Sequence, residues 1–386
     1  MSQLTSSKAT LALWTMLFGN FVIGTGVLLP AGLLSILSAS LNKSPATTSL
    51  LIFAGGLVVG FGAPVLASLS NRFDRRKLLL SALIIFAAGH MLCAMAPNFW
   101  SLLLVRTLTM VGAAVFTPQA AATVSLLVPS QQRAQAITFI FVGWAIASVV
   151  GIPLGNLLAT QIGWRATFFA VAILASIASF AVAKTMPAGL IGQPLDLSSW
   201  TRVGKSPALL CILAVTVLSL SGHFAVLGFL TPIMNDVFAV SPGTMALVFA
   251  VFGAAGIVGN YAATRFIENL GPDRTVLVGL FISTVGLSIF ALSFGNLWLA
   301  IFAIALWGLG FATNSSQQGR LVAAAPALAS ATVALNSSAV YLGQSIGAAA
   351  GGKLISQGHL TAIIWTAAIF MGLAIAASML AQNLRR

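Results

Sequence analysis

Two ionisable side chains, Arg106 and His223, lie inside long apolar stretches, where a charge is costly and usually has a function. Histidine titrates near neutral pH and can carry a proton, whereas arginine keeps its charge and offers five N–H donors. The alternatives are a neutral histidine that hydrogen-bonds a neighbouring helix and an arginine that extends toward water. The sequence therefore offers Arg106 and His223 as the two candidate residues for coupling the movement of a proton or a charge to the protein's function.

The acidic side chains are few, and none lies in the middle of an apolar stretch. They fall between the stretches or at their ends: Asp74, Asp196, Asp236, Glu268 and Asp273. Buried carboxylates are common proton carriers, because burial brings their pKa toward neutral pH. Any such role here would pass to Arg106 and His223. A site that holds a cation and no acid is expected to take a neutral or anionic ligand.

Uncharged polar and aromatic side chains interrupt the apolar stretches at helical spacing. Trp307, Phe311, Asn314 and Gln318 would share one helix face, and Tyr341 and Gln344 are similarly spaced. Amides and hydroxyls turn inward when the surroundings are apolar, either to line a wet cavity or to hydrogen-bond another helix. The predicted binding residues are Asn20, Thr25, Arg106, Gln119, His223, Phe224, Trp307, Asn314, Gln318, Tyr341 and Gln344.

The composition indicates that these residues are positioned in a lipid bilayer. Of 386 residues, 59% are hydrophobic and 6% are charged, against about 25% charged in a typical soluble domain. The net charge of +13 is spread between apolar runs, which argues against a nucleic-acid partner. Cys93 and Cys211 lie within apolar runs and predict neither a disulfide framework nor a metal site, and no cofactor is expected.

Twelve apolar runs approach or exceed the length of about 20 residues that a membrane-spanning helix needs. Their limits are 10–38, 46–70, 78–97, 100–127, 134–161, 164–185, 207–234, 242–266, 273–294, 297–319, 329–355 and 359–382. Of the 18 Lys and Arg residues, only Lys43, Arg165 and Lys353 fall at one set of ends, and Arg106 lies within a run. The excess at the other ends predicts that both termini are cytoplasmic.

An internal repeat divides the runs into two sets of six. An offset of 196 residues places Phe53 on Phe249 and Gly112 on Gly308. The same offset relates two ridges of small residues that let helix backbones approach closely. The predicted packing positions are Gly151, Pro153, Gly155, Gly343, Gly347 and Gly351. We therefore expect an all-α membrane protein with one half at 1–185, a cytoplasmic linker at 186–206 and a second half at 207–386.

Several motifs resemble the major facilitator superfamily. Residues 60–77 read GFGAPVLASLSNRFDRRK, similar to the loop between spans two and three of that family. Residues 151–155 read GIPLG and 163–168 read GWRATF, which resembles the antiporter motif of its twelve-span drug–proton antiporters. The chain is most similar to their sugar-efflux or arabinose-efflux-permease branch. Arg106 matches the arginine of span four, and His223-Phe224 fits the span-seven pattern of that branch.

The resemblance implies a fold of two parallel six-helix halves and a gate at the loop between spans two and three. Its predicted members are Asn71, Arg72, Asp74, Arg75, Arg76 and Lys77. This chain departs from the pattern in having Asn71 where an Asp is usual and Asp74 where a Gly is usual. A carboxylate that many relatives carry in span one is also missing, which puts the usual proton pathway in question.

The resulting hypothesis is a proton-coupled exporter of a small neutral or anionic organic molecule, such as a sugar, a metabolite or a drug. It would work by alternating access as a monomer in the bacterial inner membrane, with protons, substrate and lipid as its partners. An uncoupled facilitator and a broad multidrug efflux pump are the alternatives. No metalloprotease motif, paired intramembrane carboxylates or phosphate-binding loop supports an enzyme or an ATP-driven pump.

Overall fold

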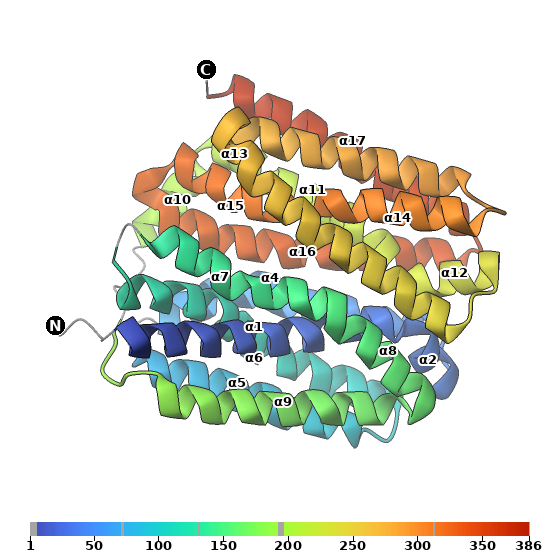
Figure 1. Cartoon of the computed structure of the whole chain (residues 1–386), viewed down its shortest axis with the longest axis horizontal. Helices are drawn as coiled ribbons and strands as arrows, with labels where there is room; N and C mark the ends of the chain where they lie inside the picture. The colour runs from blue at the N-terminus through green and yellow to red at the C-terminus, as the bar shows by residue number, and fades with distance from the viewer. Residues whose placement is uncertain (1–5, 71–72, 130–131, 192–196, 312, 386) are drawn as a thin grey trace.

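The computed structural model describes residues 6–70, 73–129, 132–191, 197–311 and 313–385, and these residues form helices joined by short connections. The helices run back and forth along one direction, and both ends of the chain lie at the same end of the molecule (Figure 1). We call the opposite end, where α2 and α12 lie, the far end. The fold is an all-α membrane fold, as predicted from the apolar runs.

The chain before the linker forms the first bundle. Its helices are α1 (Ser6–Gly32), α2 (Leu34–Ser40), α3 (Pro45–Thr48), α4 (Leu50–Ser70), α5 (Arg75–Ala94), α6 (Phe99–Leu127), α7 (Arg133–Ile146), the π-helical turn η2 (Ala147–Gly151), α8 (Ile152–Gln161) and α9 (Trp164–Thr185). Helix α10 (Leu197–Gly204) lies in the stretch predicted as a linker. That stretch is therefore partly helical, and its Val203 is buried against the second bundle.

The chain after the linker forms the second bundle. Its helices are α11 (Pro207–Leu227), α12 (Leu230–Phe238), α13 (Pro242–Leu292), α14 (Leu297–Phe311), α15 (Thr313–Ala324), the 3₁₀ turn η3 (Pro326–Leu328), α16 (Ala329–Ser356) and α17 (Leu360–Asn383). Two of the predicted runs merge in α13, where Gly271 has φ 76° and ψ 164° and breaks the helical path. A positive φ is readily adopted by glycine, so Gly271 lets the chain turn between two spans.

Polar caps fix where several helices begin. The side chains of Asp74, Asn98, Ser206 and Ser241 accept hydrogen bonds from backbone N–H groups in the first turns of α5, α6, α11 and α13. In α8, Pro153 follows a π-helical turn in which the Ile152 N–H donates to the Ala147 carbonyl. A proline cannot donate a backbone hydrogen bond, so the helix is irregular just before it.

Eleven helical segments in the described ranges are long and apolar enough to span a membrane. The predicted run at 329–355 is not among them, although α16 has 28 residues. Asn336, Ser345, Gln344 and several glycines lower its apolar character, and α16 packs against α4 and α11. A helix that is covered by other helices does not need the apolar surface that lipid requires, so the composition criterion misses it.

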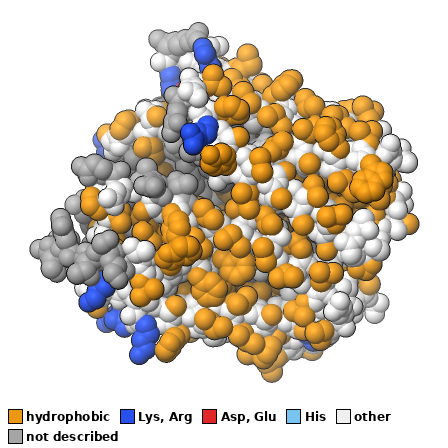
Figure 2. All heavy atoms as spheres, viewed as in Figure 1, with side chains coloured by type: hydrophobic (Ala, Val, Ile, Leu, Met, Phe, Trp, Pro, Cys, Tyr) orange, Lys and Arg blue, Asp and Glu red, His pale blue; other side chains and the backbone are white. Residues whose placement is uncertain are grey.

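Large hydrophobic side chains cover most of the visible face of the molecule, and most of the visible Lys and Arg side chains lie toward the end that holds the termini (Figure 2). Exposed examples are Phe61, Leu104, Phe180, Phe281, Trp298 and Ile369. A water-facing surface of this kind would aggregate, so the surface is suited to lipid.

Two large apolar clusters lie inside the two bundles. One consists of residues from Ala12 to Met186 together with Tyr341, and the other of residues from Val215 to Ala374. The second cluster also contains residues contributed by α1, α2, α4 and α8: Leu28, Ala31, Leu34, Ile52 and Ile152. We call these five residues and the second-bundle side chains they contact the far-end seal, because they join the bundles at that end.

Candidate functional site

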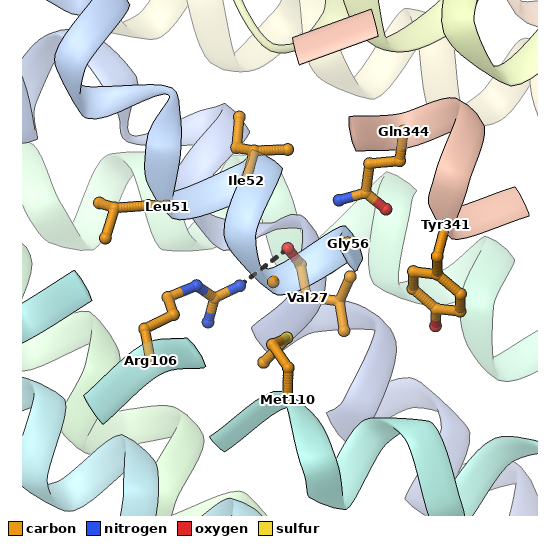
Figure 3. Close-up of a pocket in the computed structure, with 9 residues that line it drawn as sticks. Val27, Leu51, Ile52, Gly56, Arg106, Met110, Tyr341 and Gln344 are labelled. Atoms are coloured by element: carbon orange, nitrogen blue, oxygen red, sulfur yellow. Dashed lines mark hydrogen bonds between the residues drawn. The ribbon is translucent and has the colours of Figure 1, made fainter. Parts of the chain in front are cut away.

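A recess lies between the two bundles, around the side chain of Arg106 (Figure 3). Its lining residues come from α1, α4, α6 and α16: Val27, Leu51, Ile52, Gly55, Gly56, Arg106, Met110, Tyr341 and Gln344. The recess leaves no room for a water molecule between these side chains. It is therefore a closed contact between the bundles that would have to widen before it could hold a ligand.

Arg106 is the charged group of this recess. Its side chain is 1% exposed, and its Nη2 donates to the Val27 carbonyl at 3.1 Å. Nε and Nη1 have no hydrogen-bond partner among the residues that the structure describes. No carboxylate within the described residues forms an ion pair with Arg106. The sequence predicted a charged residue within a span, and the structure places it between the bundles and not at the lipid surface.

Gln344 and Tyr341 reach the recess from α16. The amide of Gln344 points into the recess from the side opposite Arg106 (Figure 3). The ring of Tyr341 lies 6.4 Å from that of Trp144 on α7 in an edge-to-face contact across the two bundles. Three predicted binding residues, Arg106, Tyr341 and Gln344, thus meet at one place.

Small residues allow α4 and α16 to approach closely beside the recess. A Cβ atom on Gly56 would lie 2.2 Å from Ser345 Oγ and 2.8 Å from the Tyr341 carbonyl oxygen. Ser345 Oγ donates to the Phe53 carbonyl at 3.0 Å, which is a hydrogen bond between the bundles. A second close approach joins Gly253 of α13 to Val149 of η2. The two bundles therefore meet along two seams of small residues.

His223 lies in a separate, aromatic environment in the second bundle. Trp307 Nε1 donates to His223 Nδ1 at 2.7 Å, so Nδ1 is unprotonated and a neutral ring carries its proton on Nε2. The ring of Phe311 contacts His223 edge-on at 4.8 Å, and Phe252 contacts Trp307. Trp307 was predicted as a binding residue, but in the structure its polar group is used to hold the histidine. Phe224, the next residue, is buried in the apolar cluster of the second bundle.

Other predicted binding residues serve as ties between helices of the first bundle. Asn20 Nδ2 donates to the Ile140 carbonyl at 3.1 Å, and Thr117 Oγ1 donates to Asn20 Oδ1 at 3.0 Å. Thr25 is buried against Gly151, and its hydroxyl has no partner. These residues lie away from the lining of the recess.

For two predicted binding residues of the second bundle, Gln318 and Asn314, the described part of the chain assigns no role. Gln318 is half-buried on α15, and the side chain of Asn314 lies outside the described residues. The shared face predicted for Trp307 and these residues spans the junction of α14 and α15. Their binding roles remain predictions.

The predicted gate ties the start of α5 to neighbouring segments. Asp74 Oδ1 accepts from the Lys77 N–H at 3.0 Å, and Oδ2 accepts from the Gly189 N–H in the linker. Arg75 is buried and donates to the predicted binding residue Gln119 on α6, while Arg76 donates to the Ala183 carbonyl of α9. Asp74 was expected to pair within the basic cluster, and in the structure its two carboxylate oxygens accept these hydrogen bonds from backbone N–H groups. Asn71 and Arg72 lie outside the described residues.

The predicted packing glycines lie where helices approach closely. A Cβ on Gly151 would be 2.4 Å from Thr25 Oγ1, and a Cβ on Gly155 would be 2.9 Å from Leu29 Cδ1, both on α1. A Cβ on Gly343, Gly347 or Gly351 would lie 2.3–2.5 Å from its nearest atom on α11 or Phe229. Pro153 is buried between the first two.

The sequence analysis missed a polar network at the end of the second bundle that holds the C-terminus. Arg320 on α15 is fully buried, and its Nε donates to Asp273 Oδ1 at 2.5 Å. Its Nη atoms donate to Gln317 Oε1 and to both oxygens of Ser378 on α17. Arg385 also pairs with Asp273. A buried arginine needs hydrogen-bond and ion-pair partners of this kind. The position of Arg320 within the polar stretch 313–320 was the feature of the sequence that could have indicated the network.

The family model of the Major Facilitator Superfamily matches residues 16–327 and 212–385. The chain is 29% identical to the "Probable sugar efflux transporter" of Helicobacter pylori (strain ATCC 700392 / 26695) over 339 residues, which are 87% of this chain and 86% of that protein. It is 28% identical to the "Inner membrane transport protein YdhP" of Escherichia coli (strain K12), covering 91% and 90% of the two chains.

A solved structure has the same fold. The bacterial homologue of the human lysosomal transporter Spinster, in its inward-facing and unoccupied conformation, superposes with a TM-score of 0.78. The identity is 16%, and the superposition covers 98% of each chain. This likeness concerns the fold alone.

Proposed function

This chain belongs to the major facilitator superfamily, whose members are membrane transporters and not enzymes, and we propose that it is a proton-coupled exporter of small organic molecules. The substrate is neutral or anionic: a sugar, a metabolite or a drug. The names of its relatives include sugar efflux transporters, which supports the sugar class.

One observation carries this proposal: a buried arginine lies between two bundles that an apolar cluster joins at the far end. Leu28, Ile52 and Ile152 of the first bundle join the apolar cluster of the second at the far end. Alternating access requires two units that close on one side of a central site and part on the other. We take residues 1–185 and 207–386 as these units and 186–206 as their linker.

The orientation follows from charge. Fourteen of the 18 Lys and Arg residues lie at the ends of the spans that share the side of the termini, and cytoplasmic loops are rich in Lys and Arg. We propose a monomer in the bacterial inner membrane with both termini in the cytoplasm. The far-end seal would then close the periplasmic side.

Proton coupling is assigned to His223, with Arg106 as the permanent charge. In proteoliposomes, a gradient of about one pH unit across the membrane supplies about 1.4 kcal/mol for each proton that crosses. If one proton is exchanged for one sugar, this energy sustains a sugar concentration gradient of up to about tenfold. We expect such accumulation with the native protein and its loss in His223→Asn. Asparagine can still accept the Trp307 N–H bond but cannot titrate near neutral pH, so exchange of labelled for unlabelled sugar should persist.

His359→Asn is the matched control, because His359 is exposed at the start of α17. Retained accumulation in His223→Asn would remove His223 from the coupling mechanism. If the native protein equilibrates sugar but ignores the gradient, the uncoupled facilitator is correct. That alternative is favoured by the absence of acidic residues from the middle of the apolar runs. Accumulation of many lipophilic cations would instead support a multidrug pump.

The gate gives a separate prediction at Asp74. Asparagine is about as good a helix cap as aspartate, so Asp74→Asn should keep the start of α5 and the melting temperature. It removes the negative charge beside Arg75, Arg76 and Lys77. A charge interaction of about 1 kcal/mol, the upper end for partly exposed groups, would change the transport rate by about fivefold. We expect slower exchange at unchanged stability.

Asp236→Asn is the control for that experiment, because Asp236 is an exposed acid at the far end, on α12. Normal exchange in Asp74→Asn would reduce the basic cluster to an anchor that sets membrane orientation.

A further inference from the structure

The N–H groups of Arg106 are the most incompletely satisfied charged donors between the bundles. Of its five N–H donors, Nη2 uses one on the Val27 carbonyl, and the three carried by Nε and Nη1 have no partner in the described part of the chain. The side chain is 1% exposed, so water does not replace the missing partners. Leaving a buried cation unpaired is strongly unfavourable, and such a group is expected to have a partner in the working cycle.

Arg320 shows what a satisfied buried arginine looks like in the same chain. Its Nε is paired with Asp273, and both Nη atoms have partners on α15 and α17. Arg106 has neither an acid nor a second acceptor among the described residues. A purely structural arginine would be expected to resemble Arg320, so Arg106 differs in the way that a ligand-binding arginine should.

The surroundings of Arg106 favour one ligand chemistry. Met110, Leu51 and Ile52 make the recess apolar, and Gln344 points into it from the other bundle (Figure 3). A guanidinium binds a carboxylate through two parallel N–H···O bonds, and the amide of Gln344 could donate to the same group. A cation would be repelled, and a neutral sugar would leave the charge uncompensated.

We propose that Arg106 and Gln344 together bind a carboxylate of the transported molecule, so that the substrates are small organic acids such as sugar acids. This rests on the proposed transport function and narrows its substrate class. The carboxylate would bridge α6 of the first bundle and α16 of the second once the recess widens. It would neutralise Arg106 when the bundles close around the ligand.

The test measures binding without requiring transport. Melting of the detergent-purified protein is followed against glucuronate, glucose and sodium chloride at matched ionic strength. We expect glucuronate to bind at least about tenfold more tightly than glucose, since a hydrogen bond to a charged group contributes about 1.5–3 kcal/mol. Arg106→Gln should abolish this preference for glucuronate over glucose.

A second variant keeps the arginine and supplies an internal partner. Gln344→Glu places a carboxylate opposite Arg106 with almost no change in side-chain shape. It should therefore stabilise the protein and weaken its affinity for glucuronate by about tenfold or more. Gln357→Glu, at an exposed position at the end of α16, is the control and should still bind glucuronate. This arm keeps the proposal testable if Arg106→Gln fails to fold.

Three outcomes would overturn the inference: equal binding of glucuronate and glucose, full glucuronate binding in Gln344→Glu, or equal stabilisation by chloride. Counterflow in proteoliposomes tests the transport function independently. A protein that binds glucuronate but moves neither compound refutes transport alone. One that exchanges glucose and ignores glucuronate refutes the carboxylate site alone.

Discussion

Asp273→Ala is expected to destabilise the protein by about 2–4 kcal/mol, because it leaves the buried guanidinium of Arg320 without its acid. Arg320 is fully buried, and Asp273 is one-third exposed, which places the estimate below the upper end for fully buried pairs. Gln317 and Ser378 would still accept from the Nη atoms, but Nε would lose its partner. Thermal unfolding in detergent, compared at one heating rate, measures the effect as a fall in melting temperature.

Arg385→Ala separates this effect from a general loss of charge. Arg385 binds the same carboxylate, but its side chain is 24% exposed, so its removal should cost less than about 1 kcal/mol. Replacing both partners, as in Asp273→Leu with Arg320→Met, should recover much of the lost stability because no fully buried charge is left unpaired. A melting temperature for Asp273→Ala equal to that of the native protein would contradict the role given to this network.

The fold was predictable because the length and spacing of apolar runs are direct consequences of a bilayer. The predicted limits of the run at 164–185 match α9, and the run at 359–382 differs from α17 by one residue at each end. The separate runs predicted at 242–266 and 273–294 agree with the break at Gly271. The differences elsewhere have local causes, because Leu33 and the stretch 228–229 interrupt two predicted runs. Breaks of one or two residues change neither hydropathy nor its period.

The site was less predictable, because the rotation of each helix about its axis decides which polar residues meet. Lipid and bundle interior are both apolar, so a span has no clear amphipathic face to reveal that rotation. Asn20 and Arg106 were both expected at the centre, yet Asn20 turned toward Thr117 and Ile140 within its own bundle. Gln119 lies three turns along α6 from Arg106 and pairs with Arg75 instead.

Arg320 and Asp273 were overlooked for a different reason. Arg320 was counted among the Lys and Arg residues that indicate topology, and Asp273 was counted among the acids at the ends of the runs, so neither needed a further role. Whether Arg320 is a surface anchor or part of a buried network depends on whether α13, α15 and α17 converge around it. Its partners Asp273 and Ser378 are 47 and 58 residues away in the sequence, so the convergence cannot be read from the sequence.

The largest conformational effect is expected for Gly253→Leu, at the seam between α13 and η2. A Cβ on Gly253 would lie 2.8 Å from Val149 Cα and 2.7 Å from Val149 Cγ2, so the clash involves backbone that cannot rotate away. Overpacking of this kind costs about 1–3 kcal/mol, and 3 kcal/mol changes a two-state equilibrium by more than about a hundredfold. The substitution should favour a state in which the far-end seal is parted.

Labelling of a cysteine in the seal measures that shift without knowledge of the substrate. Ile152→Cys is placed in a background where Cys93 and Cys211 are replaced by alanine, and its reaction with a water-soluble maleimide is timed in detergent. Ile152 is 2% exposed, so labelling should be slow in the parent and much faster with Gly253→Leu. Gly372→Leu is the control, because a Cβ there meets no atom within 4 Å. The smaller Gly253→Ala should give an intermediate rate, since its Cβ already clashes. If both Gly253 variants melt like the parent and label no faster, this seam does not part, and a rocking motion of the two bundles about it is excluded.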